Sequence, residues 1–214
     1  MQQLKGLGMS IGVYGRFAIL LNTLIFIYQQ AFMGGNQIRI ALAFGFNYEA
    51  IIGAHQYYRI LTAAFSHEGF GHIFFNMCAL VMFSISQEKP YGSLFFALLN
   101  MVILLMCSSI KLMYDHIRIF WLPLGYGGGS FEDLNTYGYG YSGILFGLLT
   151  LWCLTGDSYR NCYGVKVRKI FIPFIYLIVS SIIAENASIV GHLSGIAAGA
   201  ILRYCGIYSA RMLP

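Results

Sequence analysis

One serine in this sequence has neighbours that suit a nucleophile. The run Gly140-Tyr141-Ser142-Gly143 stands directly before an apolar stretch, at the turn into a predicted helix. Its glycines leave the hydroxyl exposed, and the free N–H groups of a helix start can stabilise a developing oxyanion. In glycine-rich membrane helices the same pattern more often serves packing. Ser142 therefore needs a nearby base before it indicates catalysis.

A histidine near the start of the last apolar stretch, in Gly191-His192-Leu193-Ser194-Gly195, is the candidate base. Alone, a membrane histidine is a base, a proton relay or a satisfied structural group. Glycines recur every fourth residue in both segments: Gly143 and Gly147 in the first, and Gly191, Gly195 and Gly199 in the second. Such faces let membrane helices approach closely. If they pair, Ser142 and His192 come within hydrogen-bond reach, as acyl transfer requires.

The orientation of the histidine also needs a partner. Phe146 lies one turn after Ser142, on roughly the same helix face. Its ring could stack on the imidazole of His192 and hold it in place of a carboxylate. The sequence places no acidic residue for that task, because Asp157 is assigned to the opposite side and Glu185 to the far end of a loop. A dyad is predicted, not a triad.

A third cluster is His67-Glu68-Gly69-Phe70-Gly71-His72-Ile73-Phe74-Phe75-Asn76. A zinc-binding HExxH helix carries its histidines four apart on one face. His67 and His72 are five apart, and at ~100° per residue they diverge by about 140°. His72 and Asn76 are four apart and share a face, so their side chains could complete an oxyanion hole or simply bond between helices. No metal or other cofactor is expected.

The composition indicates that lipid surrounds these residues. Of the 214 residues, 58% are hydrophobic and 10% are charged, against about 25% charged in a soluble domain. The mean hydropathy is +0.68. In lipid every backbone group must be satisfied internally, and the apolar stretches are too long for barrel strands. The sequence therefore predicts an all-α polytopic membrane protein.

Six spans are expected: Phe17–Phe32, Gly71–Ser86, Tyr91–Leu112, Ser142–Thr155, Ile170–Ala184 and Ser188–Ile207. An interfacial segment is expected between the first two spans, and a connection over Met113–Tyr139. With the N-terminus inside, nine Lys and Arg residues fall inside and four outside, which favours cytoplasmic termini. We attribute the net charge of +5 to the Lys and Arg residues that set the orientation in the membrane, and no nucleic acid is expected as a partner. Residues 1–16 and 208–214 are predicted to be short cytoplasmic ends around a membrane domain at 17–207.

These motifs together resemble the rhomboid intramembrane proteases. Three motifs occur here in the rhomboid order: HxxxxHxxxN, then GxSG, then a histidine at the start of a helix with glycines at every fourth residue. Tyr58-Arg59 resembles the family's aromatic-Arg loop motif, although tryptophan is usual there, and Glu88…Gly92-Ser93 resembles its Glu-xxx-Gly connection. The resemblance runs from about Tyr58 to Gly199 and implies the minimal six-span bundle. Gly-Tyr-Ser-Gly and Gly-His-Leu-Ser-Gly are most similar to the compact, endomembrane rhomboid-like-4 group.

The resemblance also implies roles for the site residues. Ser142 would be the nucleophile and His192 the general base. His72, Asn76 and the Ser142 N–H would bind the oxyanion beside Gly140, Phe146 would stack on the base, and His67 would support the second span from the loop.

The expected activity is endoproteolysis in or beside the transmembrane helix of a membrane-protein substrate, once that helix unwinds locally. A multi-pass protein of an endomembrane (ER or Golgi) or of the plasma membrane is expected. The principal alternative is an inactive protein of the same fold that binds membrane clients as a degradation adaptor. A transporter or channel would predict charged residues deep inside several spans, and the interiors here are almost uncharged.

Overall fold

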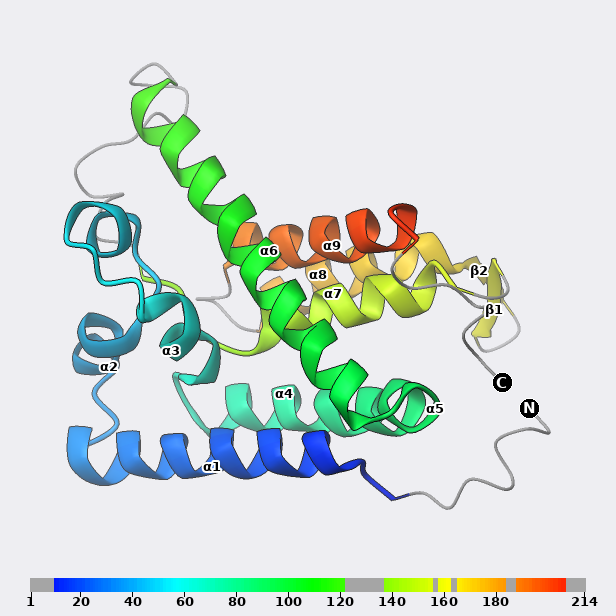
Figure 1. The fold of residues 1–214 in the computed structure, drawn as a ribbon, viewed down its shortest axis with the longest axis horizontal. Coiled ribbons are helices and arrows are strands. Elements are labelled where there is room, and N and C mark those ends of the chain that lie inside the picture. The colour runs from blue at the N-terminus through cyan, green and yellow to red at the C-terminus, as the bar shows by residue number, and fades with distance from the viewer. Residues whose placement is uncertain (1–9, 122–136, 156–157, 163–164, 184–187, 207–214) are drawn as a thin grey trace.

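The computed structural model describes residues 10–121, 137–155, 158–162, 165–183 and 188–206. Helices dominate these residues (Figure 1). Three are long and apolar enough to cross a membrane: α1 (Val13–Met33), α4 (Phe70–Phe83) with its extension to Tyr91, and α6 (Ser93–Phe120). Three shorter apolar helices follow: α7 (Ser142–Cys153), α8 (Ile172–Ile183) and α9 (Ile189–Tyr204). The predicted all-α membrane bundle is confirmed.

The remaining elements are short and lie between the apolar helices. They are α2 (Gln37–Phe44), a π-helical turn (Glu49–Gly53), α3 (Arg59–Phe65), a second π-helical turn (Ser84–Glu88), α5 (Lys89–Tyr91), β1 (Tyr159–Cys162), β2 (Val165–Arg168) and a 3₁₀ turn (Lys169–Phe171). The two strands pair antiparallel, with Tyr159 opposite Arg168. This hairpin between α7 and α8 was not predicted from the sequence.

One predicted boundary is wrong. The third span was expected to end at Leu112, but α6 continues to Phe120. A helix of 28 residues rises about 42 Å, which exceeds the ~30 Å hydrocarbon core of a bilayer. Polar contacts support the added turns: His116 bonds the Tyr48 hydroxyl at 2.7 Å, and within α6 Lys111 pairs with Asp115 at 2.6 Å.

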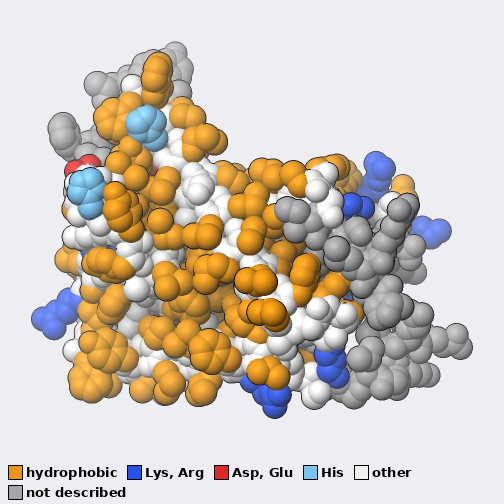
Figure 2. Space-filling view, in the orientation of Figure 1, with side chains coloured by type: hydrophobic (Ala, Val, Ile, Leu, Met, Phe, Trp, Pro, Cys, Tyr) orange, Lys and Arg blue, Asp and Glu red, His pale blue; other side chains and the backbone are white. Residues whose placement is uncertain are grey.

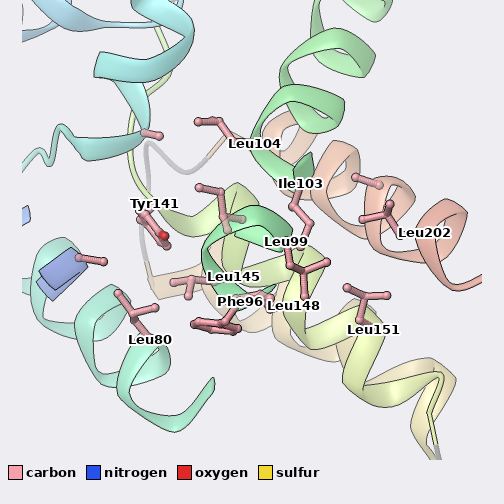
Figure 3. Close-up of a cluster of buried hydrophobic side chains, with 14 residues drawn as sticks. Leu80, Phe96, Leu99, Ile103, Leu104, Tyr141, Leu145, Leu148, Leu151 and Leu202 are labelled. Carbon is pink, nitrogen blue, oxygen red and sulfur yellow. The ribbon is translucent and has the colours of Figure 1, made fainter. Parts of the chain in front are cut away.

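The centre of the bundle is α7, which packs along α9 and is crossed by α6 (Figure 1). Most side chains of α7 are buried, and a continuous core joins it to α6 and to Tyr141 (Figure 3). The outer helices have the opposite character: α1, α6 and α8 expose many large apolar side chains. Hydrophobic side chains cover most of the face in Figure 2, with Lys and Arg at its margins. An apolar core inside an apolar surface is what a bilayer requires.

A buried carboxylate joins α1 to the end of α4. Glu88 accepts hydrogen bonds from the backbone N–H groups of Tyr14 and Gly15, at 2.7 and 2.9 Å. The hydroxyls of Ser84 and Ser93 also donate to it, each at 2.6 Å. The first N–H groups of a helix have no partner within it, and an anion there is favoured by the helix dipole. Glu88 therefore caps α1 from a neighbouring helix.

The segment between α1 and α4 is held by one guanidinium. Arg59 is buried and donates to the carbonyl oxygens of Ala41, Leu42 and Gly45 and to the side chain of Gln56. These carbonyls belong to the end of α2, where intrahelical partners run out. Arg59 thus fixes α2 against α3, and α3 supplies the backbone on which the turn before Ser142 rests.

Candidate active site

Ser142 is the first residue of α7, at the end of a strained turn. Gly140 has φ +117°, a backbone conformation that residues with a Cβ rarely adopt. Its N–H donates to the Ala63 carbonyl at 2.8 Å. Tyr141 is fully buried, and its hydroxyl bonds the side chains of Asn100 and Tyr14. These anchors hold Ser142 at the helix start, where backbone N–H groups lack intrahelical acceptors.

The structure brings the predicted base to Ser142. His192 Nε2 lies 2.9 Å from Ser142 Oγ. His192 stands in the first turn of α9, where the Ser188 side chain caps the helix by accepting from the N–H of Gly191 at 3.0 Å. The imidazole is 6% exposed. A hydroxyl and an imidazole at this distance can pass a proton, which is the first requirement for a serine nucleophile.

The ring of Phe146 lies on the imidazole, as expected. The two ring centroids are 4.4 Å apart, and the planes differ by 27°. Phe146 is itself buried between α7 and α9. A rigid ring on one face of the imidazole removes the freedom of His192 to rotate away from Ser142.

The paired glycine faces are what allow this approach. A Cβ placed on Gly195 would overlap the carbonyl of Gly143, and one on Gly199 would overlap the carbonyl of Gly147. One on Gly147 would lie 3.3 Å from the Gly195 carbonyl and 2.5 Å from Ile103. Close backbone contact therefore runs along both helices.

Gly191 does not share this role. A Cβ there would meet only the Ser188 side chain, at 3.1 and 3.3 Å. Its carbonyl instead accepts from the Cys107 thiol at 3.4 Å. Of the three predicted packing glycines on α9, Gly195 and Gly199 therefore pack against α7, whereas Gly191 belongs to the first turn of the helix.

Two nitrogen-bearing side chains of α4 converge beside the turn at Gly140. A Cβ on Gly140 would lie 2.6 Å from His72 Nε2 and 3.7 Å from Asn76 Nδ2. Asn76 Nδ2 is buried and finds no hydrogen-bond partner within the described residues. A buried unpaired donor is costly, and it is available for an oxygen that arrives only during reaction.

His67 precedes α4 and lies behind His72. Its ring centroid is 5.1 Å from that of His72, and the backbone N–H of His67 donates to the Gln29 side chain of α1 at 3.3 Å. Burial and the proximity of His72 lower the pKa of His67 to about 3, so its ring is neutral at physiological pH. The two rings meet edge to face, and in the described part of the chain no group of three metal-ligating side chains gathers.

The sequence reasoning missed one group at the site. Ser180 of α8 places its Oγ 3.5 Å from His192 Nδ1, on the side of the imidazole away from Ser142. Ser180 is one of two adjacent serines in an apolar span, and only the packing of α8 against α9 distinguishes it from Ser181. The two acidic residues that the sequence analysis excluded as orienting groups, Asp157 and Glu185, lie outside the described residues.

The comparisons with known proteins agree with the motifs. A family model, the Rhomboid domain, matches residues 54–209. The chain is 31% identical over 160 residues to "Rhomboid-like protein 14, mitochondrial" of Arabidopsis thaliana, covering 71% of this chain and 44% of that protein. It is 35% identical over 167 residues to "Rhomboid-like protein 15" of the same plant, covering 76% and 40%. It is 26% identical over 148 residues to the human "Rhomboid-related protein 4", covering 66% and 43%. The match thus spans about two fifths of the length of these relatives.

Proposed function

The chain belongs to the rhomboid family, and we propose that it is an intramembrane serine endopeptidase that uses Ser142 and His192 as a dyad. The observation that carries this proposal is the 2.9 Å approach of His192 Nε2 to Ser142 Oγ, under the stacked ring of Phe146. The serine and its base meet at the starts of α7 and α9, and the unpaired Asn76 Nδ2 lies beside the Gly140 turn that precedes the serine.

The length of α7 supports cleavage inside the bilayer. Its 12 residues rise about 18 Å, well short of the ~30 Å hydrocarbon core. At the far end of α7, Arg160 of β1 and Lys169 of the 3₁₀ turn after the hairpin lie over the Trp152 ring at 4.9 and 5.1 Å. Cations beside tryptophan are typical of the membrane–water interface. With that end at one interface, Ser142 lies about 12 Å below the other.

The proposed reaction follows from these positions. His192 accepts the Ser142 proton, the Oγ attacks the scissile carbonyl, and the leaving amine takes the proton back from His192. Asn76 Nδ2, His72 Nε2 and the N–H of Ser142 donate to the oxyanion, and water then hydrolyses the acyl-enzyme. Because a helical peptide hides its carbonyls, the substrate is a transmembrane segment that unwinds locally, for example at Gly or Pro.

The orientation follows from charge. The cationic hairpin belongs on the cytoplasmic side by the positive-inside rule. Both chain ends flanking α1 and α9 are therefore assigned to the cytoplasm, and the dyad opens toward the opposite face. We propose an endomembrane or the plasma membrane as its location, because its motifs resemble those of the endomembrane rhomboid-like-4 group.

The test is cleavage in a bilayer. The purified protein is reconstituted in liposomes with single-pass test helices that differ only in a central Gly-Pro or Leu-Leu pair, and products are identified by mass spectrometry. We expect the wild type to cut the Gly-Pro helix at a site within or beside the span, and Ser142→Ala to leave it intact. Equal cutting by both proteins would refute the dyad, and no cutting by either would favour a client-binding role.

A further inference from the structure

The side of His192 that faces away from Ser142 is turned toward α8. Its Nδ1 lies 3.5 Å from Ser180 Oγ, and no other partner for this atom is found among the described residues. Ser180 is half-buried, whereas most of its neighbours on α8 expose apolar side chains to the surface. One polar atom of α8 thus points inward at the base.

The proton of Ser180 is already engaged. Ser180 Oγ lies 3.0 Å from the Leu177 carbonyl, which has only acceptor capacity. The hydroxyl proton therefore goes to Leu177, and the oxygen presents its lone pairs to Nδ1. Nδ1 must then carry the proton of the neutral imidazole, which leaves Nε2 unprotonated and facing Ser142. This is the tautomer that a general base requires.

We propose that Ser180 is a positioning residue that fixes the tautomer of His192 and stabilises its protonated form during catalysis; this rests on the proposed function. When His192 takes the Ser142 proton, the Nδ1–H becomes part of a cation, and its bond to Ser180 becomes charge-assisted and shortens. Catalytic hydrogen bonds are often long before substrate binds and tighten in the transition state. A neutral hydroxyl, held by a backbone carbonyl, performs the orienting task for which no acidic side chain of the described residues is placed.

The adjacent Ser181 offers a matched control. It also donates to the Leu177 carbonyl, at 2.8 Å, but makes no contact with His192. Ser180→Ala and Ser181→Ala therefore remove the same atom and the same kind of helix back-bond. Apart from the spacing of that back-bond, three residues for Ser180 and four for Ser181, they differ in the bond to Nδ1.

The experiment is saturation kinetics of inactivation by an alkyl fluorophosphonate, in detergent, with thermal unfolding measured in parallel. The binding constant of the probe and the rate of the covalent step are obtained separately. We expect Ser180→Ala to slow the covalent step by about ten- to a hundredfold, with the binding constant unchanged, since it loses a bond to a charged group. Ser181→Ala should match the wild type, and Ser180→Thr, which keeps the hydroxyl, should restore most of the rate.

Two results would overturn the inference: a covalent step in Ser180→Ala as fast as in Ser181→Ala, or a Ser180→Thr variant that folds yet reacts as slowly as Ser180→Ala. A second readout does not depend on the stability of any Ser180 variant. In ¹⁵N-histidine spectra of the wild type, assigned by subtraction of His192→Gln, we expect Nδ1 protonated and Nε2 bare, and the reverse tautomer contradicts the proposal. Failure of the proposed function is distinguishable, because Ser142→Ala would then react as fast as the wild type.

Discussion

The ring of Phe146 covers one face of the His192 imidazole at a centroid distance of 4.4 Å. Both residues come from helices whose backbones meet through glycines, so the ring and the imidazole have little room to move apart. Orientation of the base is thereby built from packing on one face and, at Nδ1, from a hydroxyl of α8.

Phe146→Leu should slow fluorophosphonate labelling about tenfold, because loss of the aromatic pair removes roughly the energy of one such contact. Phe146→Tyr keeps the ring and is the control. Labelling rates at equal protein concentration measure the effect. If Phe146→Leu labels as fast as Phe146→Tyr, the aromatic ring does not contribute to the orientation of His192.

Asn76→Ala should lower the rate of peptide cleavage about a hundredfold, as loss of one oxyanion donor does elsewhere. Its Nδ2 has no partner in the described part of the chain, so the resting protein should lose little stability. The measurement combines cleavage in liposomes with thermal unfolding. A variant that unfolds readily but cleaves normally would assign Asn76 to structure instead.

Gly195→Ala should destabilise the fold by about 1–3 kcal/mol, because its Cβ would overlap the Gly143 carbonyl and push α9 from α7. Gly191→Ala is the matched control on the same helix, with an expected cost within about 1 kcal/mol, since its Cβ meets only the Ser188 side chain. Thermal unfolding of the two variants gives the comparison. If both variants lose the same free energy of unfolding, the close contact of Gly195 with the Gly143 carbonyl does not determine the cost of an added Cβ.

Glu88→Ala should cost about 3 kcal/mol, because it strands the N–H groups of Tyr14 and Gly15 and leaves two serine hydroxyls without their acceptor. Glu49→Ala, at an exposed carboxylate, is the control and should change stability by less than about 0.5 kcal/mol. Unfolding in a denaturing detergent measures both. A mild Glu88→Ala phenotype would argue that α1 is held by lipid contacts alone.

The neutral, buried state of His67 predicts acid sensitivity. Its pKa is about 3 in the folded chain against 6.5 when unfolded, so the unfolded chain binds the extra proton as pH falls from 6.5 toward 3. The contribution of His67 to the free energy of unfolding is therefore present above pH 6.5 and declines as the pH falls below it. At pH 5 the loss from this group is about 2 kcal/mol. Thermal unfolding of wild type and His67→Gln across pH should show a shallower slope in the variant. Identical slopes would contradict the burial of His67.

Much of this arrangement could be predicted from residue spacing. The six apolar helices follow from run length, and the approach of Ser142 to His192 from the two glycine periods. These are local or repeating signals. Since His72 and Asn76 share a helix face by spacing alone, their convergence could also be expected, while their role at an oxyanion stays a prediction.

What could not be predicted depends on tertiary contact. The inward direction of Ser180 is set by how α8 rotates against α9, which an almost uniformly apolar span does not reveal. The extension of α6 to Phe120 follows from the contact of His116 with Tyr48, residues far apart in sequence. Gly191 shares the period of Gly195 but lies at the helix start, where a Cβ on it would meet the Ser188 side chain and no backbone atom of α7.

The proposed activity depends on the activation of Ser142 by His192. The most direct measurement is fluorophosphonate labelling of the detergent-solubilised wild type, Ser142→Ala and His192→Ala, with the adduct located by mass spectrometry. We expect an adduct on Ser142 in the wild type and none in either variant, with all three proteins unfolding at similar temperatures. A folded wild type that stays unlabelled, or a His192→Ala protein that labels as fast as the wild type, would contradict it.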